Sequence, residues 1–340
     1  MNSSGRRPVV DVAYQGGGAV TVAERTDRAK VLQRLRLGDS AFRHLTRIAA
    51  IAVLIILSGI IVSLVQGSWP ALHQFGFAFL YTEVWNPVTD QYGAIAPIYG
   101  TVVTSIIAML IAVPIGLFIA LFLTELCPKW LRRPIGIAIE LLAGIPSIIY
   151  GIWGLFVFAP FLQQHVQPFL IDVFGPIPVL STLFAGPPYG IGILTAGLIL
   201  AIMVLPFITS ISRDVFDAVP PVLKEAAYGL GCTTWEVARY VVLPFTRVGV
   251  IGGIMLGLGR ALGETMAVTF VIGNAHRISG SIMAPGTTIS ATIANEFTEA
   301  VGDLYTSSLI ALGLILFVIT FIVLAAARLM LMRLNARLGT

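Results

Sequence analysis

The 340-residue sequence contains little charge and almost no cysteine. Asp, Glu, Lys and Arg together make up only 11% of its residues, whereas 57% are hydrophobic. Soluble globular proteins carry about 25% charged residues, so this chain has too few charges to cover its apolar surface in water. The same proportions exclude disordered and fibrous proteins, and two cysteines exclude a small fold held by disulfides. The composition therefore predicts an integral membrane protein.

Motifs of stand-alone enzymes are also absent from the sequence. It has no Gly-x-x-x-x-Gly-Lys-Ser/Thr loop for nucleotide phosphates, no Gly-x-Ser-x-Gly and no His-Glu-x-x-His. The glycines between 257 and 263 miss the spacing of a dinucleotide-binding loop. The histidines are scattered rather than set at metal-ligand spacing: His44, His73, His165 and His276. We therefore expect no catalytic residue, no metal and no cofactor, and any ATP must be hydrolysed by a separate subunit.

Six apolar runs are long enough to cross a membrane as helices, which need about 20 residues each. They cover roughly residues 48–65, 98–123, 135–160, 190–211, 248–272 and 304–332. The runs are too long for barrel strands and do not alternate in polarity. Membrane helices tolerate internal prolines, here Pro114, Pro146 and Pro206, when neighbouring groups satisfy the freed carbonyls. The predicted fold is an all-α integral membrane domain of six transmembrane helices.

Basic residues are distributed unevenly around these runs. Of the 21 Lys and Arg residues, 19 lie before the first run, after the last, or in the second-to-third and fourth-to-fifth connections. The opposite connections contain only Arg277, and Arg260 lies within the fifth run. Because cytoplasmic loops are enriched in Lys and Arg, both termini are predicted to be cytoplasmic, in a multi-pass membrane protein. Cys127 and Cys232 then face the cytoplasm, where a disulfide is not expected. The net charge of +4 reflects this topology and predicts no binding of nucleic acid.

The sequence divides into two parts by composition. Residues 1–40 are polar and basic and are predicted to be a disordered cytoplasmic segment, with a regulatory contact as the alternative. Residues 41–335 are predicted to form the six-helix transmembrane domain, in which 213–247 is the longest cytoplasmic connection. On the other side, residues 67–97 are rich in aromatics. This density favours an interfacial belt or a short helix on the membrane, with a partner-docking surface as the alternative.

The long connection between the fourth and fifth runs has the pattern of two short helices. Pro221 is accepted in the first turn of a helix, apolar residues then recur at helical spacing, and Gly231 suits a left-handed stop. Thr233 and Glu236 have the spacing of a capping box that starts a second helix. We expect that helix to end before Pro244.

This connection resembles the EAA loop of importer-type ABC permeases. The matching positions are Glu225, Ala226, Ala227, Gly231, Leu243 and Pro244, and Val241 stands where isoleucine is more usual. The resemblance implies a type I ABC importer permease, in which this loop forms a coupling helix that docks into a cleft of the ATPase subunit. From the residues alone, an ordinary amphipathic interface helix is the alternative.

Two charged residues, Arg260 and Glu264, lie in the fifth run, at a depth where a charge costs about 2.5–3.5 kcal/mol. A spacing of four places them on one face of a continuous helix. One interpretation is a structural ion pair. The other, which we favour, is that Arg260 meets an anion and Glu264 is its resting counter-ion, because the planar guanidinium matches a tetrahedral oxyanion.

Glycine and proline shape the neighbouring sequence. Gly249, Gly253 and Gly257 form one i, i+4 row, which is expected to let helices approach closely. In the third run, the sequence from Gly144 to Ser147 favours a simple proline kink. The alternative is a full break that exposes amide donors to an anion.

Residues 142–154, residues 259–265 and the EAA loop together closely resemble the C-type membrane subunit of phosphate-specific ABC importers. Residues 1–40 fall outside this resemblance. It implies a heterodimer with a homologous A-type permease subunit, two ATPase subunits, an external phosphate-binding protein and a lipid environment. The implied phosphate pathway contains Ser147, Arg260, Glu264 and Thr265. A permease for another oxyanion, such as sulfate or molybdate, and an ATP-independent anion carrier or channel are the alternatives.

Overall fold

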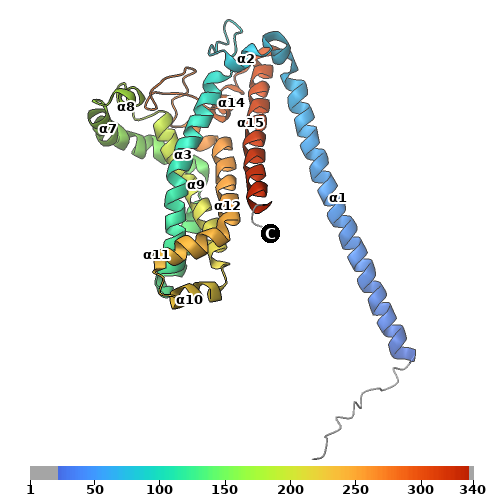
Figure 1. Ribbon diagram of the computed structural model, residues 1–340. Helices are drawn as coiled ribbons and strands as arrows, with labels where there is room; N and C mark the ends of the chain where they lie inside the picture. The colour runs from blue at the N-terminus through green and yellow to red at the C-terminus, as the bar shows by residue number, and fades with distance from the viewer. Residues whose placement is uncertain (1–21, 337–340) are drawn as a thin grey trace, which may run out of the picture. The chain divides into compact units, whose positions relative to one another are not determined.

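The computed structural model describes residues 22–336, which form helices joined by short connections (Figure 1). Within these residues, the single β-pairing is an isolated bridge between Asn86 and Gln91. Six helical segments are long and apolar enough to cross a membrane: Ala41–Phe75, Ile95–Leu126, Ser147–Phe174, Ile193–Asp217, Thr234–Gly263 and Asp303–Arg333. The predicted all-α fold with six transmembrane helices is confirmed.

By its internal contacts, the chain divides into two compact units between Ile61 and Val62. The described part of the first unit is a single helix, the N-terminal portion of α1 (Val22–Phe75). Residues 22–40 were predicted to be disordered but are helical, because Ala, Leu, Arg, Lys and Gln are good helix formers. Residues 1–21 lie outside the described residues. From residue 41 to residue 60 every side chain is exposed, so this helix offers its apolar surface to lipid or to another subunit.

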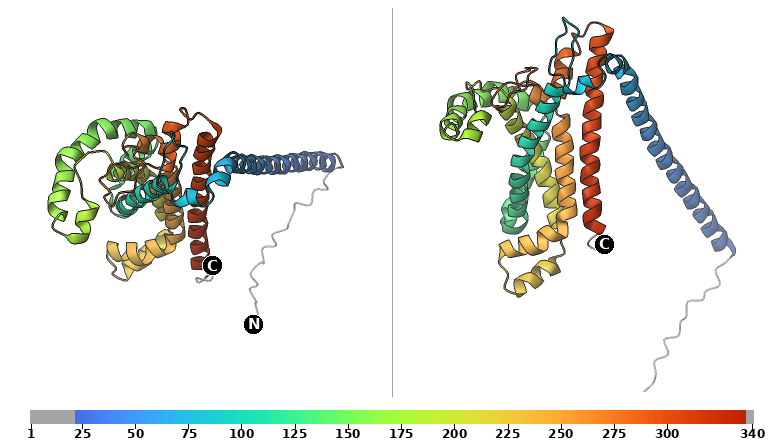
Figure 2. Two further views of the ribbon diagram at one scale, coloured as in Figure 1. Left: turned by 90° about the horizontal axis from the view of Figure 1, so that it is seen from above. Right: turned by 45° about the horizontal axis from the view of Figure 1, so that its top comes forward.

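The second unit is built around α3 (Ile95–Leu121) and α9 (Ile193–Asp217), which lie side by side (Figures 1 and 2). Gly197 allows their close approach, since a Cβ there would lie 2.7 Å from Ile107 Cγ2. α12 (Leu243–Gly263) packs against α9 on its other side, and α15 (Asp303–Ala336) contacts α12.

The predicted glycine row forms the contact between α12 and α9. A Cβ added at Gly249, Gly253 or Gly257 would lie 2.6–3.0 Å from side-chain atoms of Val215, Ile211, Ile208 and Val204. Because only hydrogen fits there, the two helices approach more closely than larger residues would allow. The expected packing role of these glycines is confirmed.

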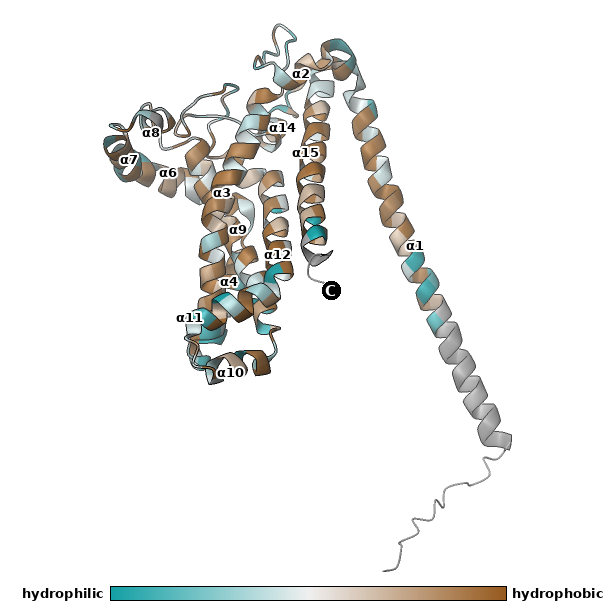
Figure 3. Cartoon of the chain, viewed as in Figure 1, coloured by the Kyte–Doolittle hydropathy of each residue, from teal (hydrophilic) through white to brown (hydrophobic). Residues whose placement is uncertain are grey.

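The bundle has two distinct ends, which we name by a helix that each carries (Figure 1). The α10 end carries α10 (Pro221–Gly229), α11 (Thr234–Val237) and two π-helical turns, η1 (Phe122–Leu126) and η4 (Ala238–Val242). The α14 end carries α2 (Ala78–Tyr81), α14 (Ile289–Glu296) and the connections around them. Apolar residues follow the middles of α3, α12 and α15, and hydrophilic residues are more frequent toward α11 (Figure 3).

The third run is broken rather than kinked. α4 (Lys129–Ala143) ends before Gly144, and α5 (Ser147–Trp153) starts directly after Pro146. Pro146 has ψ 139°, an extended conformation that stops the helix. The third candidate span therefore runs from Ser147 to Phe174 and not over 135–160. It continues through η2 (Gly154–Phe158), α6 (Ala159–Phe161), η3 (Leu162–Val166) and α7 (Gln167–Phe174), and α8 (Pro178–Leu183) follows.

The aromatic residues between 67 and 97 do not all face outward as a belt. Tyr92 is buried, and its ring stacks on Tyr305 with 5.3 Å between ring centroids. The indole of Trp85 stacks on His276 at 5.3 Å. These rings join the connection before α3 to α15 and to the loop after α13 (Met266–Thr269). Three other aromatic side chains of the region are exposed, as a belt requires: Trp69, Phe77 and Tyr81.

Candidate functional site

The helix that carries Arg260 ends sooner than the sequence predicts. α12 stops at Gly263, and Glu264 is extended with ψ 129°. Arg260 therefore lies in the last turn of α12, while Glu264 belongs to the connection that leads into α13. Glu264 Oε1 accepts the Ala267 backbone N–H at 3.4 Å. The prediction that Arg260 and Glu264 share one face of a continuous helix is wrong, and the two make no ion pair in this structure.

Arg260 lacks a counter-ion within residues 22–336. Its guanidinium carbon lies 4.3 Å from the centroid of the Phe207 ring, a cation–π contact that stabilises the charge. Its Nε atom is buried and has no hydrogen-bond partner among the described residues. A buried donor without a partner costs free energy, so this guanidinium has the capacity to bind an anion.

The break between α4 and α5 lies near the break between α12 and α13. The Tyr150 hydroxyl, on α5, donates to the Leu142 carbonyl at 2.9 Å and so spans the break between α4 and α5. The charge of Arg260 also acts on this hydroxyl. Ser147, the first residue of α5, is partly buried. Phe207 and Tyr150 were missed at the sequence level. Phe207 belongs to no recognisable motif, and Tyr150 lies within residues 142–154 without a feature that singles it out.

Close packing of α5 against α13 brings the two breaks together. A Cβ at Gly151 would lie 2.7 Å from the Phe270 ring and 3.1 Å from Ala267 Cα. Thr265 precedes α13, and its carbonyl accepts the Thr269 hydroxyl at 2.8 Å. The structure thus places the Tyr150 hydroxyl within reach of the charge of Arg260, and it places Glu264, Thr265 and Ser147 at the two breaks.

The α10 end has the helix-turn-helix predicted from the sequence. α10 begins at Pro221, and Gly231 follows its C-terminus with φ +88°. Cys232 N–H donates to the Ala227 carbonyl, and Gly231 N–H donates to the Tyr228 carbonyl, which is the Schellman arrangement. Ala227 is buried, and Leu243 is partly buried against the same apolar cluster. Glu225 and Ala226 are exposed.

The second helix of this motif does not end before Pro244. Thr233 and Glu236 form the predicted capping box, and α11 then continues through η4 into α12. In η4 the Leu243 N–H donates to the Ala238 carbonyl, five residues back. This wider turn accommodates Pro244, which has no N–H and would clash with a carbonyl in a regular α-helix. Pro244 itself is exposed.

Three ion pairs lie at or near the α10 end, and none follows from sequence spacing. Lys224 Nζ lies 2.5 Å from Glu125 Oε1, with both side chains largely buried. Arg213 on α9 pairs with Glu140 on α4 at 2.6 Å. The third pair joins Arg132 to Asp217. Two of these pairs join α4 to α9, and the third joins α10 to η1.

The surface of α10 exposes large apolar side chains. Leu230 is 86% exposed and Val222 is 71% exposed. Single exposed apolar residues are ordinary, but these two lie at opposite ends of one short helix that also presents Glu225. In residues 22–336, no group of three or more His, Cys, Asp or Glu side chains could hold a metal ion.

Comparison with known proteins identifies the family. Residues 112–335 match the family described as "Binding-protein-dependent transport system inner membrane component". The "Phosphate transport system permease protein PstC" of Mesorhizobium japonicum is 71% identical over 317 residues, which are 93% of this chain and 97% of that protein. The protein of the same name from Pasteurella multocida is 60% identical over 88% of this chain and 93% of its own length.

Solved structures share the fold. A bacterial alginate ABC transporter, solved in complex with an alginate-bound periplasmic protein, matches 92% of this chain and 98% of its own with a TM-score of 0.57 at 17% identity. The inward-facing MetNI methionine ABC transporter matches 74% of this chain and 99% of its own with a TM-score of 0.53 at 16% identity. With six candidate spans, the chain is a multi-pass inner-membrane ABC permease subunit, and it belongs to the family of binding-protein-dependent transport system inner membrane components.

Proposed function

We propose that this chain is the permease subunit of an ATP-driven importer of inorganic phosphate, and that Arg260 contacts the anion during passage. The observation that carries this proposal is that the Arg260 guanidinium lacks a charged partner among the described residues. It is a cation beside two helix breaks, with a buried Nε that lacks a partner within residues 22–336 and with no counter-ion there. The names of the closely similar relatives, which are phosphate transport system permeases, support phosphate as the anion.

The helix breaks assist the arginine in this proposal. Helix ends at a membrane's midplane supply unpaired amide donors to anionic substrates. Ser147 begins α5 at one break, and Glu264 and Thr265 form the other. Glu264 accepts a backbone N–H and leaves Arg260 open to substrate. Its carboxylate adds negative charge near the path, which favours release of the anion.

The α10 end provides the contact with the ATPase in this proposal. The exposed Glu225, Ala226 and Leu230 lie on a helix that resembles the coupling helix of importer permeases. The uneven distribution of Lys and Arg supports a cytoplasmic location for this end. The complete transporter then contains a homologous A-type permease, two ATPase subunits and an external phosphate-binding protein.

Uptake of labelled phosphate by the reconstituted complex tests the proposal. Arg260→Gln is expected to abolish uptake with little loss of assembled complex, and Arg260→Lys is expected to leave partial uptake, because it keeps the charge but loses the planar fork. Arg247→Gln, near the start of the same helix, removes an equal charge away from the breaks and is expected to transport normally.

Four results would contradict the proposal. Normal uptake by Arg260→Gln would remove the arginine from the pathway. Recovery of uptake in the double variant Arg260→Gln/Glu264→Gln would show that the two residues only neutralise each other. Full inhibition by sulfate or molybdate at phosphate-like concentrations, or uptake without ATP, would show a different substrate or a different transport class.

A further inference from the structure

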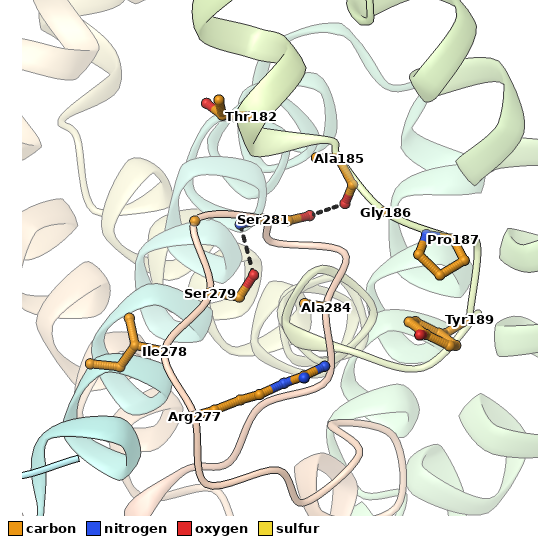
Figure 4. Close-up of a pocket in the computed structure, with 11 residues that line it drawn as sticks. Thr182, Ala185, Gly186, Pro187, Tyr189, Arg277, Ile278, Ser279, Ser281 and Ala284 are labelled. Atoms are coloured by element: carbon orange, nitrogen blue, oxygen red, sulfur yellow. Dashed lines mark hydrogen bonds between the residues drawn. The ribbon is translucent and has the colours of Figure 1, made fainter.

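The α14 end contains an open cavity of about 460 Å³ that the proposed pathway does not use. Two segments enclose it: the loop from Arg277 to Ala284, and the connection from Thr182 to Tyr189 (Figure 4). Arg260 is not among its lining residues. The cavity has room for a tetrahedral oxyanion with part of its water shell.

The lining of this cavity mixes polar and apolar groups and contains one cation. The Arg277 side chain extends from its loop across the cavity toward the segment of Pro187 and Tyr189 (Figure 4). Ser279 and Ser281 add hydroxyl groups. Within the described part of the chain Arg277 makes no ion pair, so its guanidinium donors are available to a ligand.

Hydrogen bonds hold the cavity walls in place without any ligand. Ile278 N–H donates to Glu83 Oε1 at 2.7 Å, and the Tyr99 hydroxyl donates to the Ser279 carbonyl at 3.0 Å. The Ser281 hydroxyl donates to the Ala185 carbonyl at 2.6 Å. Because both segments are fixed to each other and to α3, little ordering remains to oppose binding.

The charge around the cavity makes Arg277 distinctive. Within residues 76–94, 167–192 and 273–303, which surround the α14 end, Arg277 is the single Lys or Arg. The same segments contain six carboxylates: Glu83, Asp90, Asp172, Glu296, Glu299 and Asp303. A predominantly negative surface repels an approaching anion. Arg277 is then the one place in these segments where a positive side chain attracts the anion, and this place is the cavity.

We propose that the Arg277 cavity is a second oxyanion-binding site, which receives inorganic phosphate at the α14 end before it reaches Arg260. The identity of the anion rests on the proposed function; the site itself rests on the cavity and its charge. The nearby Glu83 carboxylate, fixed on the Ile278 N–H, keeps the affinity low enough for the anion to move on.

A thiol reporter in the cavity tests the site without transport. Gly280 lines the cavity, and a Cβ there meets no atom within 4 Å, so Gly280→Cys fits in a chain whose Cys127 and Cys232 are replaced by Ser. The full chain, solubilised with its copurifying subunits, is treated with an anionic or a cationic methanethiosulfonate reagent. The anionic reagent is expected to react faster, and inorganic phosphate to slow it more than chloride at equal ionic strength.

Added to this background, Arg277→Gln is expected to lower the anionic-to-cationic rate ratio roughly fivefold, the size of one close charge at a partly exposed site, and to remove the protection by phosphate. Arg277→Lys should keep the ratio, and Arg133→Gln at the α10 end should change neither quantity. Equal protection by phosphate and chloride would overturn the proposal. A second combination of results would also overturn it: phosphate does not protect Gly280→Cys, and Arg277→Gln lowers the affinity for an external protein. That combination would identify a protein-docking surface.

The reporter keeps this inference separate from the proposed function. Arg260→Gln is expected to stop uptake but to leave phosphate protection of Gly280→Cys intact. Loss of protection in Arg260→Gln would mean that the two arginines form one site, which contradicts a second site but not phosphate transport.

Discussion

Glu296 is the most heavily engaged carboxylate of the α14 end. It lies on α14, where only 19% of its side chain is exposed, and it accepts hydrogen bonds from Trp85 at 2.6 Å and Tyr305 at 2.8 Å. His276 Nε2 lies 2.7 Å from its other oxygen. Burial by itself raises the pKa of this carboxyl, but the hydrogen bonds from His276, Tyr305 and Trp85 outweigh burial and lower its pKa below the ordinary 4.5.

The lowered pKa predicts a pH-dependent stability. The charged form of Glu296 stabilises the folded state above the ordinary pKa of 4.5, and this contribution is lost as the pH falls through the lower folded-state pKa. Glu296→Gln is expected to cost about 1–3 kcal/mol near neutral pH, and the cost should shrink in acid. Thermal midpoints of the purified protein, measured from neutral pH downward, check this.

Glu299 provides the matched control for that measurement, because it is exposed and has the same charge. Glu299→Gln is expected to leave the thermal midpoint nearly unchanged at every pH. A constant difference between the parent and Glu296→Gln down to the most acidic sample would show that the hydrogen bonds do not depend on the charge.

At the scale of single residues, the sequence indicated which side chain was a functional candidate but not which side chains contact it. The charge of Arg260 in an apolar run identified a functional candidate, because a cation at that depth is costly. Its ring partner Phe207 and its neighbour Tyr150 lie on other helices, and no spacing rule connects them to α12. The break after Gly263 was missed because that glycine was not interpreted as a helix stop, and Glu264 was placed on the same helix as Arg260.

At the scale of elements, two nearby glycines of the coupling motif differ in backbone conformation. Gly231 has φ +88°, and Gly229 lies within α10 without a positive φ. A Cβ at either position meets no atom within 4 Å. A larger side chain at Gly231 would therefore not clash with the rest of this chain. Substitution there is limited by the left-handed backbone conformation.

Alanine at these two positions separates backbone strain from side-chain size. Gly231→Ala is expected to cost about 1–2 kcal/mol, to loosen the Schellman turn and to lower phosphate uptake per ATP hydrolysed. Gly229→Ala is expected to strengthen α10 by up to about 1 kcal/mol. Protease sensitivity of the 218–233 segment and the ratio of uptake to ATP hydrolysis measure both effects. Equal behaviour of the two variants would argue against a role for the left-handed turn.

Elements with local signals were predicted well, and those set by tertiary contacts were not. The capping box at Thr233 and the stop at Gly231 depend on neighbouring residues only, so the sequence contained them. The turn η4 carries the chain through Pro244, and its wider hydrogen bonding is stabilised by packing of Val242 and Ala238 into the α10-end core. Pro244 therefore led to the prediction of a helix end, whereas in the structure the helix continues through Pro244 into α12.

The whole molecule has an orientation that labelling can establish. The distribution of Lys and Arg predicts that the α14 end faces outward and the α10 end faces the cytoplasm. Gln91 at the first end is exposed, and Leu230 at the second is 86% exposed. In a chain without Cys127 and Cys232, Gln91→Cys is expected to react with an impermeant maleimide on intact cells, and Leu230→Cys only after permeabilisation. The reverse pattern would overturn the orientation.

The number of spans could be predicted from the sequence because membrane thickness sets the length of an apolar run. The boundary between the two compact units could not be predicted from the sequence. α1 is continuous from Val22 to Phe75, and the division at Ile61 reflects where its residues begin to contact the rest of the chain. The composition does not change at that point, where Ser58 and Ser63 interrupt an otherwise apolar run on both sides, so it contains no signal.

The Lys224–Glu125 pair gives the coupling motif a mechanical property. Lys224 on α10 and Glu125 in η1 are 99 residues apart in sequence and 2.5 Å apart in space. A force applied to α10 is therefore delivered to two spans at once, to α12 through α11 and η4, and to α3 through η1. Since packed protein interiors are stiff, an ATPase that displaced α10 at the proposed contact would move the spans on both sides of α9, α3 and α12, together.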